Sequence, residues 1–90
     1  MANKRNLKKQ INTLCGTLLI ECVATAHFKT GIPQEDIDSI MVSTLNLQSD
    51  MISRVSHVEP GLKASIFFKK LRKELAERAE DIMNQLYAIA

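Results

Sequence analysis

Apolar side chains recur every three or four residues along almost the whole chain, and this period is broken at only two places. The breaks come at Gly31 with Pro33 and at 59–61, where Glu, Pro and Gly stand together. Apolar residues three and four apart share one face of an α-helix. With three glycines, two prolines and 4% aromatic residues, the chain has little of the chemistry that sheets and their turns require. The spacing therefore predicts helices over about 5–29, 33–56 and 62–89.

Helices of similar length joined by short loops pack as antiparallel neighbours. We therefore predict an all-α protein, a single up-down-up antiparallel three-helix bundle over residues 1–90. A domain of this size buries only about 60–65% of its unfolded surface. Association of copies into a homo-oligomer would add to that burial.

Each predicted helix carries an apolar stripe that we expect to face the core. In the first helix the stripe is Leu7, Ile11, Leu14, Leu18 and Cys22, with Cys15, Leu19, Val23 and Ala26 beside it. In the second it is Ile37, Ile40, Met41, Leu45, Met51, Ile52 and Val55, with Leu47 at its edge. In the third it is Ala64, Phe68, Leu71, Leu75, Ala79, Ile82, Leu86 and Ile89.

Charge is distributed unevenly along this bundle, although the formal net charge is only +2. The end where the first and third helices begin collects ten basic and three acidic residues, and the opposite end two basic and seven acidic ones. Cations at a helix N-terminus oppose the helix dipole, and broken local rules tend to mark functional surfaces. The predicted anion or partner contacts are Lys4, Arg5, Lys8, Lys9, Lys69, Lys70 and Lys73.

The first helix has more apolar surface than two neighbouring helices need. Its apolar arc covers about half of the helix circumference or more, and Gly16 within it allows another helix to approach closely. Surplus apolar surface on a small domain indicates a partner. An antiparallel two-fold dimer would also set each basic end against the acidic end of the other copy. The predicted oligomer interface is Gly16, Leu19, Ile20, Val23 and Ile66.

Two functions are compatible with these surfaces. The preferred interpretation is a non-enzymatic bundle that acts through self-association, as a homodimer, or through another protein partner. The alternative is weak, sequence-independent binding of nucleic acid or phosphate by the basic end. The low net charge, the acidic half and the scarcity of aromatic residues for base stacking count against that alternative.

No spacing typical of a catalytic or metal site occurs in the sequence. The two histidines, His27 and His57, are expected at opposite ends of the bundle. Cys15 and Cys22 lie seven residues apart on one helix, about 10 Å along its axis, which is too far for a disulfide. We therefore expect no enzyme, catalytic residue, metal or cofactor, and two packed, reduced thiols.

The first thirty residues have some features of a signal peptide, because basic residues precede an apolar run over 11–20. However, Glu21 ends that run directly, and an uncharged stretch from Gln10 to Ile20 is shorter than the roughly 20 residues of a membrane span. The sequence thus favours a cytoplasmic protein with no membrane contact.

Three stretches carry a resemblance to other proteins: the opening Met1–Lys9, the segment Glu21–Ala24 and the segment Ile52–His57. In these stretches the chain resembles a group of small uncharacterised all-helical bacterial proteins. The resemblance implies a stand-alone bacterial protein and assigns no role to any residue.

Overall fold

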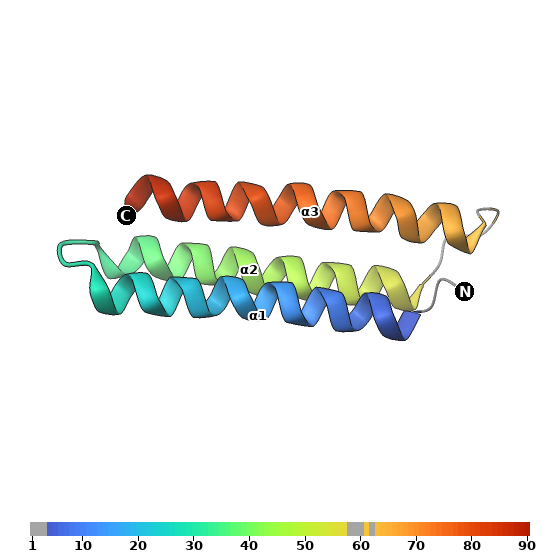
Figure 1. Cartoon of the computed structure of the whole chain (residues 1–90), viewed down its shortest axis with the longest axis horizontal. Helices are drawn as coiled ribbons and strands as arrows, with labels where there is room; N and C mark the ends of the chain where they lie inside the picture. The colour runs from blue at the N-terminus through green and yellow to red at the C-terminus, as the bar shows by residue number, and fades with distance from the viewer. Residues whose placement is uncertain (1–3, 58–60, 62) are drawn as a thin grey trace.

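A computed structural model shows three α-helices that run up, down and up along one long axis (Figure 1). The structure describes residues 4–57, 61 and 63–90. The helices are α1, Lys4–Phe28, α2, Gln34–Ser56, and α3, Ala64–Ile89. The predicted all-α three-helix bundle is confirmed, and each helix end falls within two residues of its predicted position.

Glycines occupy the turns at both ends of the bundle. Gly31 has φ +84° and Gly61 has φ +85°, the left-handed region that residues with a Cβ adopt only at a cost. Gly31 thus ends the first helical segment as predicted. Pro33 stands just before α2, and its carbonyl accepts a hydrogen bond from the backbone N–H of Asp36 at 3.1 Å. Glu59 and Pro60 of the second break lie outside the described residues.

The core is a column of apolar side chains that extends along the whole bundle. Its α1 members are Leu7, Ile11, Cys15, Leu18 and Cys22. Its α2 members are Ile37, Ile40, Leu47, Met51 and Val55, and its α3 members are Phe67, Phe68, Leu71, Leu75, Ala79, Ile82 and Leu86. Among the described residues, one polar residue is buried with them, Thr44, whose hydroxyl donates to the carbonyl oxygen of Ile40 at 2.9 Å.

Two leucines of α2 exchange the places that the sequence pattern predicts for them. Leu47, expected at the edge of the stripe, is fully buried, whereas Leu45, expected within it, is 48% exposed. The buried positions 37, 40, 44, 47 and 51 follow a spacing of three and four that includes Thr44. Because a hydroxyl bonded to its own helix can occupy a core position, Thr44 belongs to the stripe, and Leu45 lies about 100° further round the helix.

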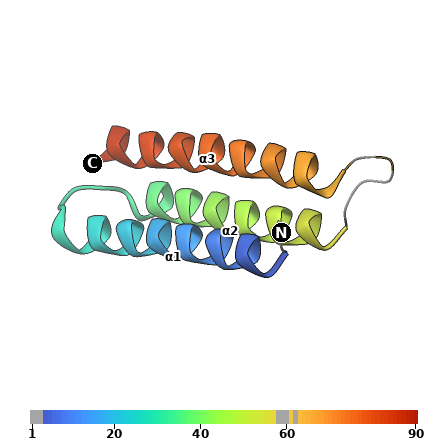
Figure 2. The same ribbon diagram turned by 45° about the vertical axis from the view of Figure 1, so that its right-hand side comes forward.

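The three helices do not surround the core symmetrically. Figures 1 and 2 show α2 between α1 and α3, and α2 forms the main packing surface for both. On the α1 side, Gln48 Nε2 donates to Asn12 Oδ1 at 2.8 Å. The α1–α3 side of the bundle is the more open one, and a surface groove runs along it.

Candidate functional site

The described part of the chain offers two buried thiols and no cluster of metal-binding side chains. Cys15 and Cys22 are free thiols without solvent exposure, as predicted. Burial raises the pKa of both, opposed at Cys15 by the positive charge of Arg78 and reinforced at Cys22 by Glu21. Across residues 4–57, 61 and 63–90, no group of three or more His, Cys, Asp or Glu side chains is arranged to hold a metal ion.

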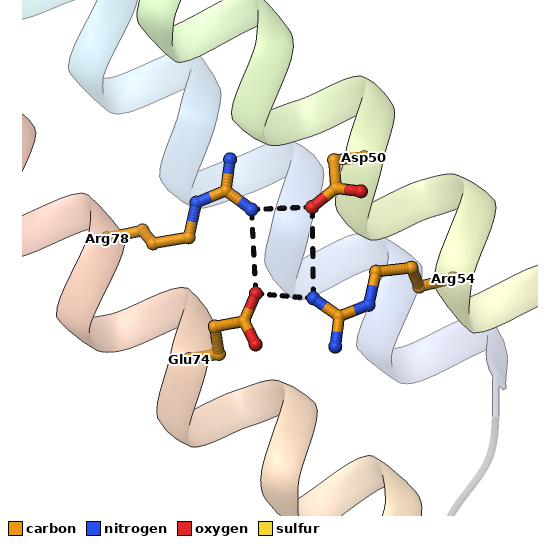
Figure 3. A network of polar contacts seen from close by, with 4 residues as sticks. All are labelled: Asp50, Arg54, Glu74 and Arg78. Atoms are coloured by element: carbon orange, nitrogen blue, oxygen red, sulfur yellow. Dashed lines mark hydrogen bonds and ion pairs between the residues drawn. The ribbon is translucent and has the colours of Figure 1, made fainter. Parts of the chain in front are cut away.

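Four charged side chains form a closed network between α2 and α3 (Figure 3). Arg78 lies 2.5 Å from Asp50 and 3.6 Å from Glu74, measured from its guanidinium nitrogen to the carboxylate oxygens. Arg54 lies 3.8 Å from Asp50 and also contacts Glu74. Positive and negative groups alternate around the network, so each charge faces two opposite ones. We call these four residues the charge quartet.

The charge quartet corrects the charge distribution read from the sequence. By position along the predicted helices, Arg54, Asp50 and Glu74 are among the charges counted at the basic end, and Arg78 is among those counted at the acidic end. That count treats them as separate surface charges. In the structure they neutralise one another within the α2–α3 interface. Arg78 and Glu74 are one helical turn apart in α3 and form an ion pair. Counting the charges of the two ends separately placed these two residues at opposite ends. Among the described residues outside the quartet, the charges are still segregated between the two ends of the bundle.

The second half of α1 presents apolar side chains to solvent, on the side opposite its core stripe. Ile20 is 67% exposed, Val23 57% and Phe28 79%. Leu19 is half-buried and borders the same shallow surface hollow as these three. Among the described residues, nothing beyond the backbone of its own turns lies within 4 Å of where a Cβ on Gly16 would stand. We call Gly16, Leu19, Ile20, Val23 and Phe28 the outer stripe.

The structure brings together four of the five predicted interface residues and separates the fifth. Gly16, Leu19, Ile20 and Val23 lie on successive turns of α1. Ile66 is 55% exposed but lies in the first turn of α3, at the opposite end of the bundle from Val23. Phe28, which is not among the predicted interface residues, extends the stripe. It lies two steps of four beyond Ile20, by way of Ala24, so that spacing continued to the end of the helix would have identified it.

The predicted basic residues lie at one end of the bundle, on more than one face. Lys4, Arg5, Lys8 and Lys9 border a common surface hollow on α1. All three predicted α3 lysines are exposed in the first turns of that helix: Lys69, Lys70 and Lys73. Arg72 of α3 borders the same surface groove as Lys9 of α1. Arg72 was counted in the basic end but was not predicted as a contact residue.

The groove on the open side of the bundle, which we call the α1–α3 groove, has a volume of about 500 Å³. Leu14 and Leu75 form its apolar floor, and Ala76 and Thr17 border it. Arg72 Nε donates across it to Gln10 Oε1 at 3.4 Å. The groove and the basic hollow share Lys9 and Thr13, so apolar surface and positive charge adjoin here.

By length and composition alone, α1 is apolar enough to cross a membrane, a test that core helices and signal sequences also pass. One face of α1 is buried in the bundle, including Ile11 and Leu18.

The chain matches no protein-family model, no curated protein and no solved structure with which it was compared.

Proposed function

We propose that this chain is a non-enzymatic protein that acts by self-association, as a cytoplasmic homodimer paired through the outer stripe of α1. The observation that carries the proposal is the exposure of Ile20, Val23 and Phe28 on successive turns of one helix. Contiguous apolar surface of this kind is typical of an interface between proteins. Gly16 supports it, because a helix without a Cβ at that point can be approached closely by a second helix.

Charge complementarity favours a second copy as the partner. In an antiparallel α1–α1 pairing centred on Ile20, Lys9 lies about 16 Å from the centre along the axis, at 1.5 Å per residue. The partner's α1 extends only about 12 Å in that direction, to Phe28. Lys9 would therefore lie level with the turn after α1 and the start of α2, where Glu35 and Asp36 occupy the first turn. A two-fold axis makes this contact twice.

The size of the interface contribution can be worked from the exposure of Ile20. Full burial of an isoleucine side chain contributes about 1.5–3 kcal/mol, and 67% of this side chain is available for burial. Each copy then contributes about 1–2 kcal/mol, and a symmetric dimer about 2–4 kcal/mol. At 1.4 kcal/mol per tenfold, Ile20→Ala should raise the dimer Kd by roughly 30-fold to several hundred-fold.

The experiment is sedimentation equilibrium of the wild type, Ile20→Glu and Val42→Glu at micromolar to millimolar concentration. Val42 is a matched control, because it is 54% exposed on α2 and is not part of the outer stripe. We expect the wild type and Val42→Glu to be dimers. Ile20→Glu should be a monomer that keeps the circular dichroism spectrum of a helical protein. A wild type that remains monomeric at millimolar concentration refutes the proposal. Flotation of that monomer with vesicles would assign the outer stripe to a membrane instead.

A second candidate function is weak binding of polyanions at the basic end, favoured by the hollow that Lys4, Arg5, Lys8 and Lys9 border. Phosphate neutralisation releases counterions, so the affinity must fall steeply with salt. Fluorescence anisotropy with nucleic acid at two salt concentrations tests this, with Lys8→Glu/Lys9→Glu as the variant and Lys29→Glu as a control at the other end. Absence of binding at low salt, together with dissociation of the dimer in the double variant, would assign these cations to self-association.

A further inference from the structure

We infer that the α1–α3 groove binds a single-chain amphiphile with an anionic head, such as a medium-chain fatty acid. This inference concerns a different surface from the outer stripe and goes beyond self-association. It rests on three features of the groove: its apolar floor, the cations at its rim and its length.

The floor and walls of the groove suit an alkyl chain. Leu14 and Leu75 supply the floor, and most of the surface exposed in the groove is apolar, although polar residues such as Thr13 and Thr17 also line it. Leu75 is 5% exposed, so it keeps its place in the core while one side of it borders the groove. A volume of about 500 Å³ lies within the range of roughly 300–1,000 Å³ that is typical of small-ligand sites.

Positive charge at one end of the groove specifies the head group. Lys9 and Arg72 face each other from α1 and α3, and Lys9 also borders the basic hollow with Arg5 and Lys8. Arg72 is held across the groove by Gln10 at 3.4 Å, an arrangement that leaves other guanidinium N–H groups able to donate to a carboxylate. A carboxylate between these cations would make charge-assisted hydrogen bonds, with its alkyl chain directed along the floor.

The length of the groove favours a small amphiphile over a partner helix. From Lys9 to Thr17, α1 contributes eight residues of rise, or about 12 Å. An acyl chain of roughly ten carbons fits that span, whereas a helix lying in it would be held over only about two turns. Isolated helices that short are marginal in water, and contacts over so short a groove would offset little of the conformational entropy lost when such a helix forms.

The experiment is a titration of the whole chain with decanoate below its micellar concentration. Binding is monitored by calorimetry and by the NMR chemical shifts of backbone amides. Decyltrimethylammonium has the same chain with a positive head, and butyrate has the same head with a short chain. We expect saturable binding of decanoate alone, with the largest shifts at Thr13, Thr17 and Ala76.

Two variants with a matched control locate the site. Arg72→Glu should weaken decanoate binding by about tenfold or more, because it replaces an attractive charge by a repulsive one. Lys70→Glu makes the same charge change two residues away, about 200° round the helix, and should leave the affinity within twofold. Ala76→Phe should abolish binding by filling the groove, and Thr17→Phe repeats this test from α1 if the first variant loses helicity.

Several results would overturn the inference. Absence of saturable decanoate binding would do so, as would equal binding of the cationic amphiphile. Equal losses in Arg72→Glu and Lys70→Glu would show that only net charge matters. Unchanged affinity in both Phe variants would place the ligand elsewhere on the surface. Because the readouts are amide shifts and heat, each result is independent of the dimer mass that tests the proposed function.

Discussion

Removal of one carboxylate from the charge quartet should destabilise the bundle by an amount that the geometry allows to be estimated. Asp50→Asn removes the 2.5 Å contact with Arg78 across the interface and the 3.8 Å contact with Arg54 within α2. An i,i+4 pair contributes about 0.3–0.5 kcal/mol, and an exposed pair between elements about 0.2–1 kcal/mol. The side chains are 33–45% exposed, so solvent screens them and these surface values apply. The expected loss is about 0.5–1.5 kcal/mol.

The assay is thermal unfolding at a fixed protein concentration, because association would otherwise shift the midpoint. For a chain of this length, 1 kcal/mol corresponds to a change in Tm of about 4–8 °C, so Asp50→Asn should lower Tm by roughly 2–12 °C. Glu77→Gln is the control, because Glu77 is an exposed acid on α3 that forms no ion pair within the described part of the chain. It should change Tm by about 2 °C or less.

Salt separates the ionic contribution from any loss of packing. In 1 M salt the Debye length falls to about 3 Å, so the difference between Asp50→Asn and the wild type should shrink by at least half. A double-mutant cycle of Asp50→Asn with Arg78→Gln should give a coupling energy of about 0.5–1 kcal/mol. Equal effects of Asp50→Asn and Glu77→Gln, or a difference that salt does not reduce, would refute this account of the quartet.

Four further predictions concern the core and the turns. In urea unfolding, Leu47→Ala should lower the free energy of unfolding by about 2–5 kcal/mol and Leu45→Ala by less than about 1 kcal/mol. A larger loss for Leu45→Ala would mean that Leu45, as predicted from the sequence, is the core residue. Native Cys15 and Cys22 should resist a bulky maleimide that labels the unfolded chain quickly, and rapid native labelling would contradict their burial. Because burial raises the pKa of both thiols above the ordinary 9.0, the unfolded chain loses these protons first. The free energy of unfolding should therefore fall as pH rises through this region, less steeply in a Cys15→Ala/Cys22→Ala variant. Gly31→Ala should cost about 1 kcal/mol by chemical denaturation because of its positive φ.

The number of helices and their order could be predicted because each depends on local signals. Spacing by threes and fours identifies a buried face, and Gly31 ends a helix by its own backbone preference. Leu45 was misplaced because a hydrophobicity pattern cannot recognise that Thr44 satisfies its hydroxyl internally and takes a core position.

The surfaces were harder to predict than the fold, because they depend on how one helix is rotated against another. Arg54 and Glu74 are twenty residues apart, and only the packing of α2 on α3 makes them partners. Arg72 and Lys9 likewise meet only through the α1–α3 arrangement. The exposed Ile20 and Val23 were predictable, since an arc too wide for its neighbours is visible in one helix alone.

The odd number of helices determines how the molecule would bear a mechanical load. The start of α1 and the end of α3 lie at opposite ends of a body 50 Å long (Figure 1). A force that draws these ends apart acts parallel to all three helices, so the α1–α2 and α2–α3 interfaces are both loaded in shear. Rows of interlocked core side chains and the charge quartet then resist together, whereas a hairpin of two helices pulled from its adjacent ends would peel open one turn at a time.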